Sequence, residues 1–308
     1  TRLGNAPMKS LLPFIALAWL SSCGESSDPD SLGLNPEVRT ASWPVTSLAQ
    51  ALVPESITVH CSLPAGADPI TWQPSREEIA VFQRAEQIVL NGAGLEGWTA
   101  GISLPSSRVI DTSRTLTSVL IIREDDLHSH GPRGTHTHAG IDPHTFLDPH
   151  QLKAMAGAIR DGFQRTWPAE AAGIEERFTR LALEIDALDK ELVLLTDLLE
   201  GKTLLASHPA YDYLARRYGW SLISFDLDPE TALTEEQITA LSLAIQETQP
   251  CALLWESAPD SNTAAMILTR LKLPSVVWDP AESPSSGPSD DFIQRQEANA
   301  ARLASLLR

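Results

Sequence analysis

One long amphipathic pattern, from about Pro168 to Glu200, restricts the architecture more than any other feature of the sequence. Its apolar residues recur at alternating steps of three and four: Phe178, Leu181, Ile185, Leu188, Leu192 and Leu195. This spacing predicts a single α-helix with one apolar stripe. Proline suits the first turn of such a helix, and Gly201 suits the position just past its end. At about 1.5 Å per residue the helix is about 50 Å long, enough to run the height of two packed units.

Strand and helix patterns alternate on both sides of this helix. Before it, SITVHCSL, QIVLNGAG and SVLIIRE have strand patterns and REEIAVFQRAE has a helical one. After it, the strand patterns TLLASHP, SLISFDL, CALLWES and SVVWDP alternate with three helical segments. Such alternation is typical of parallel sheets covered by helices. The sequence therefore predicts an α/β fold with two lobes joined by one long helix.

These patterns also predict the domain boundaries. Residues 43–167 form the predicted first lobe, which includes a histidine-rich loop at 128–150. Residues 168–201 form the linking helix, and residues 202–308 form the second lobe. A coiled-coil dimer seam is the alternative for the helix, but a single stripe between α/β units more often packs on its own chain. We therefore expect a monomer.

The segment before the first lobe has the features of an export signal. The apolar run LLPFIALAWL is too short to span a bilayer as a mature helix but suits the apolar region of a signal peptide. It ends in Leu20-Ser21-Ser22-Cys23, which resembles the bacterial lipobox. We predict a signal peptide over 1–23, lipid attachment at Cys23 and a polar tether over 24–42. The protein would then be periplasmic or otherwise extracytoplasmic, lipid-anchored to a bacterial membrane; an ordinary secretory signal with a chance cysteine is the alternative.

The net charge of the chain restricts which classes of partner are expected. With 23 basic and 40 acidic residues the chain carries a formal charge of −17, which repels nucleic acid and attracts cations. A nucleic-acid partner is therefore not expected.

The two remaining cysteines, Cys61 and Cys251, lie in apolar strand patterns of different lobes, so two buried thiols are favoured over a disulfide.

Six of the eight histidines fall in the stretch HSHGPRGTHTHAGIDPHTFLDPH, residues 128–150. Neutral imidazole is the commonest protein ligand for zinc, and three or four such donors make a site. His128, His130, His136 and His138 stand among Ser, Gly, Pro and Thr, which predicts a mobile loop. The loop is therefore predicted to capture metal or to form part of a metal site, since a merely polar linker would not concentrate imidazole in this way.

The residues around these histidines resemble a known family. GIDPHTFLDPHQLKAMAGAI is similar to the Asp-Pro-His signature of the cluster A-I metal-binding proteins, the solute-binding components of zinc and manganese ABC importers. GADPITWQPSREEIAVFQRAEQIVLNGAGLEGW, SHPAYDYLARRYGW and SVVWDP resemble other family segments in the expected order. The resemblance spans about residue 45 to the end. It implies two Rossmann-like lobes joined by one backbone helix, with a metal ion in the cleft between them and ABC permease and ATPase subunits as partners.

The resemblance also implies metal ligands. His144 matches the imidazole ligand of the first lobe, and His208 and Asp279 match the imidazole and carboxylate ligands of the second. Imidazole at position 208 favours Zn²⁺ over Mn²⁺, because manganese prefers oxygen donors. Ligands from both lobes would let the ion close the cleft.

One position departs from the family pattern. The family usually has a histidine directly after Gly-Ala-Asp-Pro, whereas this chain has Ile70, whose side chain cannot bind an ion. The hypothesis at this stage is that His136 and His138 from the histidine-rich loop replace it. Glu256, at the end of CALLWES, is a further carboxylate that could bind the ion or contact His208.

Three other functions remain open at this stage. The same fold carries manganese, or iron in haem and siderophores, but the histidine content argues against those larger ligands. A zinc-dependent hydrolase would need a general base near a metal-bound water. The sequence contains no HExxH, no G-x-S-x-G and no phosphate-binding glycine loop, so an enzyme is not expected.

Overall fold

The computed structural model describes residue 1 and residues 36–116, 119–123, 127–129, 135–137, 140–285 and 290–308. Residues 35–308 form one compact unit. The predicted signal peptide, Cys23 and most of the predicted tether lie outside the described residues. Within the described part of the chain, no helix is both long enough and apolar enough to cross a membrane.

The first half of the unit contains a four-stranded parallel sheet in the order β2-β1-β3-β4. Its strands are β1 (Glu37–Thr40), β2 (Thr58–Cys61), β3 (Gln87–Leu90) and β4 (Val109–Asp111), and α1 (Trp43–Leu52) and α2 (Arg76–Arg84) lie between them in the chain. The sheet begins inside the stretch that the sequence assigns to the tether. The sequence patterns did not predict β1, because it has only four residues, two of them charged. Such a strand has too few apolar residues to stand out in a sequence.

The segment SVLIIRE does not join this sheet, contrary to the strand prediction. Its described part contains only β5 (Ile122–Arg123), which pairs antiparallel with β8 (Gly140–Ile141). Ile122 is 76% exposed, so the apolar run does not mark a buried strand here. The fourth sheet position is occupied instead by β4, whose three residues are too few for a periodicity.

The second half repeats the same order, β10-β9-β11-β12, again with all neighbours parallel. Its strands are β9 (Thr203–Ala206), β10 (Ser221–Ser224), β11 (Ala252–Trp255) and β12 (Ser275–Val277), and the helices between them are α5 (Asp212–Tyr218), α6 (Glu235–Thr248) and α7 (Ser261–Arg270). All four strands lie in the predicted segments. The two parallel sheets confirm the predicted α/β fold class.

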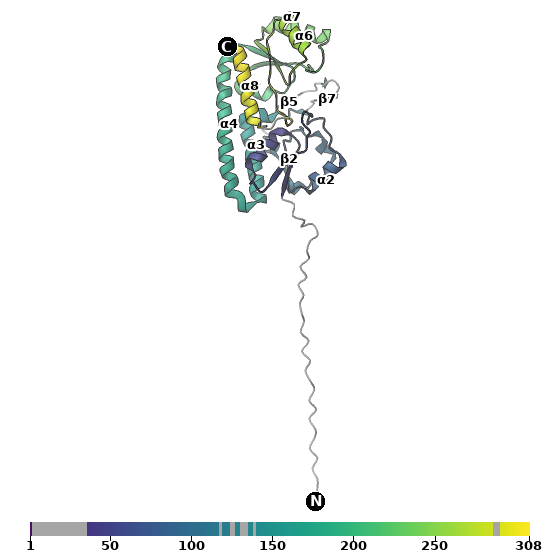
Figure 1. Ribbon diagram of the computed structural model, residues 1–308, viewed down its shortest axis with the longest axis vertical. Coiled ribbons are helices and arrows are strands. Elements are labelled where there is room, and N and C mark those ends of the chain that lie inside the picture. The colour runs from purple at the N-terminus through teal and green to yellow at the C-terminus, as the bar shows by residue number, and fades with distance from the viewer. Residues whose placement is uncertain (2–35, 117–118, 124–126, 130–134, 138–139, 286–289) are drawn as a thin grey trace. The chain divides into compact units, whose positions relative to one another are not determined.

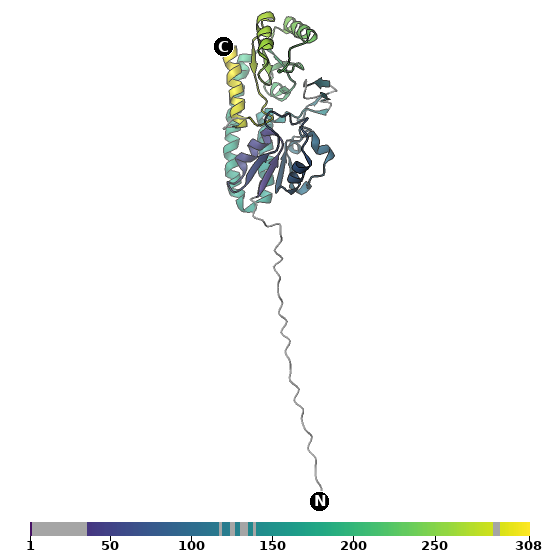
Figure 2. The same ribbon diagram turned by 45° about the vertical axis from the view of Figure 1, so that its right-hand side comes forward.

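Two helices, α4 (Ala171–Leu199) and α8 (Phe292–Leu307), contact both halves. The predicted linking helix is observed as a short 3₁₀ turn, η6 (Pro168–Glu170), followed by α4. α4 contacts α1 and α3 (Pro149–Thr166) of the first half and α5 of the second. The C-terminal helix α8 lies beside α4 in both views (Figures 1 and 2). The stripe residues Leu181, Ile185, Leu188, Leu192 and Leu195 are all buried in one core that also includes residues of both sheets.

Short elements fill the connections. The remaining 3₁₀ turns are η1 (Gly97–Gly101), η2 (Ser106–Arg108), η3 (Thr112–Thr115) and η5 (Thr145–Leu147). In the histidine-rich loop, β6 (Leu127–Ser129) pairs antiparallel with β7 (Thr135–Thr137), with His128 opposite His136 in the backbone register. The loop therefore includes a short paired ribbon where the sequence predicts irregular chain. His130 and His138 lie outside the described residues.

Candidate metal centre

His144 is fixed by the residues around it in the Asp-Pro-His sequence. Its side chain is 1% exposed. Asp142 Oδ1 accepts the backbone N–H of His144 at 3.0 Å and lies 2.6 Å from the ring atom Nδ1. A carboxylate on one ring nitrogen sets the orientation of an imidazole and makes the other nitrogen a better metal donor. This short motif therefore aims Nε2 of His144 away from Asp142.

The Nε2 atom of His144 meets Glu282, a residue from the segment after β12. The distance from His144 Nε2 to Glu282 Oε1 is 2.8 Å. Burial alone would lower the pKa of His144, but the two carboxylates outweigh this effect and raise the pKa to about 10. The two carboxylates thus favour the protonated ring, and an ion binding at Nε2 would compete with a proton there.

His208 comes from the second half and faces the same region. It follows β9, its side chain is 6% exposed, and its ring centroid lies 5.8 Å from that of His144. Glu256 Oε2 lies 3.9 Å from His208 Nδ1, which is an ion-pair distance and longer than a hydrogen bond. The structure thus brings His144 and His208 together and sets Glu256 beside His208.

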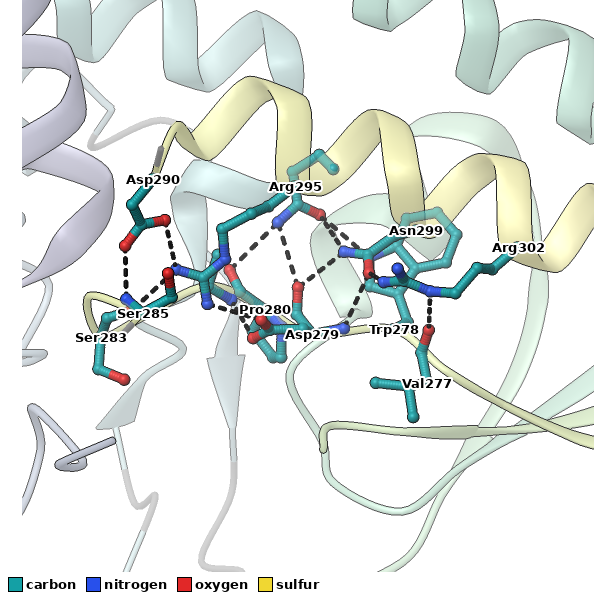
Figure 3. Close-up of polar contacts among 12 residues, drawn as sticks. Val277, Trp278, Asp279, Pro280, Ser283, Ser285, Asp290, Arg295, Asn299 and Arg302 are labelled. Atoms are coloured by element: carbon teal, nitrogen blue, oxygen red, sulfur yellow. Dashed lines mark hydrogen bonds and ion pairs between the residues drawn. The ribbon is translucent and has the colours of Figure 1, made fainter. Parts of the chain in front are cut away.

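Asp279 reaches the same region but is already engaged (Figure 3). Its Oδ2 atom lies 2.6 Å from a guanidinium nitrogen of Arg295, and its Oδ1 atom accepts the backbone N–H of Ala281 at 2.8 Å. Arg295, on α8, also contacts Asp290 at 3.2 Å and the carbonyl of Ser283 at 2.9 Å. Arg295 therefore ties the segment that follows β12 to α8 and competes with any cation for Asp279.

A pocket of about 230 Å³ joins His208, Glu256, Asp279 and Glu282, and His144 is not in its lining. It is lined by Gly66, Ala67, Asp68, Ile70, His208, Glu230, Glu256, Ser257, Asp279, Pro280, Glu282 and Ser283. The lining includes five carboxylates and one imidazole, and the first half contributes only the stretch 66–70. An acidic concave surface raises the local concentration of cations. The arrangement can therefore attract a cation and present nitrogen and oxygen donors to it.

The predicted ligands do not yet converge on one point in this conformation. Considering only the side chains that are described, no three His, Cys, Asp or Glu groups are close enough together to hold a metal ion. In the same conformation His144 is paired with Glu282 and Asp279 with Arg295. That His144, His208 and Asp279 bind one ion stays a prediction.

The histidines outside this pocket have other surroundings. His60, on the edge strand β2, has a side chain that is 46% exposed and lies 3.8 Å from Glu37. His150 stands in the first turn of α3, where its backbone N–H donates to Asp148. For His128 and His136 the backbone alone is described, so their predicted metal-binding roles remain predictions, as do those of His130 and His138.

Three residues of this region were missed by the sequence analysis. Asp142 could have been found, because it precedes His144 by two residues in the quoted motif. Arg295 lies in a helical segment with no site signal, and Glu282 lies in AESPSSGPSD, a stretch that resembles an ordinary loop. Their roles depend on where α8 and the segment after β12 pack. Cys61 and Cys251 are both free thiols, as predicted, but each is half-buried and not buried as expected.

Comparison with known proteins gives one family match and many relatives. The family model described as "Zinc-uptake complex component A periplasmic" (ZnuA) matches residues 38–306. The zinc-binding lipoprotein AdcA of Streptococcus pneumoniae serotype 4 is 22% identical over 302 residues, which cover 95% of this chain and 59% of AdcA. The high-affinity zinc uptake system protein ZnuA of Bacillus subtilis is 22% identical over 279 residues, covering 88% of this chain and 87% of that protein.

Solved structures give the same result for the fold. The crystal structure of Zn(II)-bound AdcA from Streptococcus pneumoniae superposes with a TM-score of 0.75 at 19% identity, covering 89% of this chain and 58% of that chain. The chain spans about half to three fifths of the length of the AdcA proteins that it matches. The structural likeness supports the two-lobe α/β fold.

Proposed function

The chain belongs to the family of ZnuA, the periplasmic component A of zinc-uptake complexes, and from this premise we propose that it binds Zn²⁺ outside the cytoplasm and delivers it to an ABC importer. The resemblance stated from the sequence is thereby confirmed at the level of the family. The partners that this proposal implies are a permease and an ATPase. Catalysis is not part of the proposal, since the family is a transport component.

One observation carries the proposal: His144 and His208, from different halves, lie with ring centroids 5.8 Å apart beside an acidic pocket. We propose these imidazoles as zinc ligands, with Asp279 as a carboxylate ligand once it leaves Arg295. Two imidazoles favour zinc over manganese, which binds oxygen donors better. The four histidines His128, His130, His136 and His138 are proposed to capture zinc near the pocket.

Lipid anchoring at Cys23 and a monomeric state complete the proposal. A protein that hands an ion to a membrane permease benefits from a tether, because the tether raises its concentration at the membrane. The part of the predicted tether that precedes β1, residues 24–36, has the polar composition of such a tether.

The test is a titration of metal-stripped protein with zinc, manganese and a ferric chelate while the midpoint of thermal unfolding is followed. A ligand that binds only the folded state stabilises it by about 4 kcal/mol at about 1,000 times its Kd. We expect zinc to raise the midpoint strongly. The variant His208→Ala should lose most of this rise, and His60→Ala should keep it. A rise with manganese or the chelate and none with zinc would contradict the proposal.

A further inference from the structure

We propose that Asn91 is a positioning residue of the candidate metal centre: its side-chain amide holds the backbone that carries His144, so zinc affinity depends on a residue that is not among the predicted ligands. The inference deepens the proposed zinc-binding function and rests on it. Asn91 directly follows β3 of the first sheet, in the stretch LNGAG, and it is fully buried.

The side-chain amide of Asn91 reaches the residue that precedes His144. Its Nδ2 atom donates to the carbonyl of Pro143 at 3.0 Å, in a buried contact between positions 52 apart in the sequence. The same nitrogen donates to the carbonyl of Gly92 at 3.0 Å. Because proline has no N–H, its carbonyl is the only group through which Pro143 can be held by a hydrogen bond. Asn91 uses that group.

The peptide unit between Pro143 and His144 is thereby held at both of its polar groups. Its carbonyl accepts from Asn91, and its N–H donates to Asp142 Oδ1 at 3.0 Å. A peptide unit is planar and turns as one body, so two hydrogen bonds at its opposite sides fix its orientation. This orientation sets where the side chain of His144 starts and so where its Nε2 atom lies.

Asn91 can hold this peptide unit because its own backbone is fully bound. Its N–H donates to Glu96 Oε1 at 2.9 Å, and its carbonyl accepts the hydroxyl of Thr112 at 2.9 Å and the N–H of Ser113 at 3.1 Å. Thr112 and Ser113 directly follow β4, the strand beside β3. Asn91 therefore ties the backbone of His144 to a fixed turn at the end of the first sheet.

The surroundings of the amide explain why an asparagine fits this position. Both atoms that the amide meets are carbonyl oxygens, so its nitrogen and not its oxygen must face them. The Oδ1 atom of Asn91 is then buried and has no hydrogen-bond partner in the described part of the chain. An unpaired buried oxygen lowers stability, which an apolar side chain would avoid. The two bonds that Nδ2 donates give this cost a purpose.

The experiment measures the zinc affinity of the full metal-stripped protein and of variants at neutral pH, by competition with a chromogenic zinc chelator. Asn91→Asp keeps the shape of the side chain and replaces the donating nitrogen with an oxygen. Gln87→Glu makes the same change at the other end of β3 and is the matched control. Gln87 is also buried, and its Nε2 atom donates to the hydroxyl of Thr166, at the end of α3, at 2.7 Å.

We expect Asn91→Asp to weaken zinc binding by about tenfold or more and Gln87→Glu to leave the Kd nearly unchanged. Hydrogen exchange in the metal-free protein should become faster over residues 144–147 in Asn91→Asp and not in Gln87→Glu. Thermal unfolding of each metal-free variant establishes that it is folded, and Asn91→Ala replaces Asn91→Asp if the latter does not fold. Similar losses of affinity in both variants would overturn the inference.

A double-mutant cycle separates positioning from a general loss of structure. In a chain that carries His144→Ala, adding Asn91→Asp should cause no further loss of affinity, because Asn91 acts through His144. The same loss in both backgrounds would show that Asn91 acts by another route and would overturn the inference, as would a zinc affinity that His144→Ala leaves unchanged. If the unaltered protein fails to bind zinc at all, the proposed function fails and not only this inference.

Discussion

Two buried carboxylates of the first half, Asp142 and Glu96, each bind several donors and so fix local backbone. Asp142 holds His144 by its backbone and by its ring. Glu96 Oε1 accepts from the Ser42 hydroxyl at 3.1 Å and the Asn91 N–H at 2.9 Å, and its Oε2 accepts the Gly92 N–H at 3.0 Å. Glu96 therefore joins the start of α1 to the turn after β3. Gly92 has φ of +75°, and a side chain there would collide with Asp111.

The charge state of Glu96 leads to a prediction about pH. Burial raises its pKa from 4.5 to about 7, although its three hydrogen bonds act in the opposite direction. Between pH 4.5 and 7 the folded protein keeps this proton and the unfolded chain releases it, so stability falls as pH rises through this window. A pKa difference of about 2.5 corresponds to about 3 kcal/mol.

Glu96→Gln should remove this part of the pH dependence. Denaturant unfolding from pH 4.5 to 8 measures it for both proteins, and the difference between them cancels the groups that they share. The unfolding free energy of the unaltered protein minus that of Glu96→Gln should fall as pH rises, because only the unaltered protein loses the contribution of the Glu96 proton. A difference that stays constant across the range would show that Glu96 ionises normally in the folded state.

Among the elements, α3 lies at the centre of the packing: it contacts α4, α1 and β4. It has two internal glycines with different surroundings. A Cβ added at Gly162 would come within 2.2 Å of Cδ1 and 2.7 Å of Cγ1 of Ile110, a buried residue of β4. A Cβ at Gly157 would meet no atom within 4 Å. The absence of a side chain at Gly162 therefore lets α3 approach the sheet closely.

This pair gives a matched test of packing against helix propensity. Gly157→Ala should stabilise the protein by about 0.5–1 kcal/mol, because alanine favours the helix. Gly162→Ala gains the same propensity but should be destabilising by about 1–3 kcal/mol, since the added Cβ would collide with the buried side chain of Ile110. Urea unfolding measures both, and equal effects of the two substitutions would disprove the close packing of α3 on β4.

In the molecule as a whole, a buried tyrosine connects the halves directly behind the candidate metal centre. The hydroxyl of Tyr213, on α5, donates to the carbonyl of Asp142 at 2.9 Å and accepts the N–H of Ile121 at 3.0 Å. Tyr213 is fully buried. It thus holds the backbone that carries Asp142, and through it His144, against the second half.

Tyr213→Phe should therefore affect both stability and zinc binding. One buried and one partly buried backbone group would lose the Tyr213 hydroxyl as a partner, which costs about 1–3 kcal/mol. Denaturant unfolding should show this loss, and hydrogen exchange should show faster exchange at Ile121. Zinc affinity should fall less than in His208→Ala, because no donor is removed. Unchanged exchange at Ile121 would mean that the hydroxyl does not hold this segment.

Much of the fold could be predicted from local patterns. The helices α4 and α2 follow from apolar periodicity, because each has an apolar face that repeats over two turns or more. The strands of the second sheet are too short to show a period, but each lies in a run of apolar and β-branched residues. β1 and β4 could not be found in this way, since each contains only one or two apolar side chains and lies among polar residues. SVLIIRE was misassigned because an apolar run indicates burial only if the chain around it packs there, and Ile122 is exposed.

For the candidate site, the sequence by itself determined which imidazoles were predicted as ligands: His144 and His208 each stand in a short motif, and in the motif of His144 the nearby Asp142 orients the ring. Only the tertiary structure decided how these groups pair. Glu282 meets His144 because its carbonyl binds the start of α1, and Asp279 turns to Arg295 because α8 packs beside it. Contacts of this kind join residues more than a hundred positions apart or on different elements, and no local pattern of residue types records them.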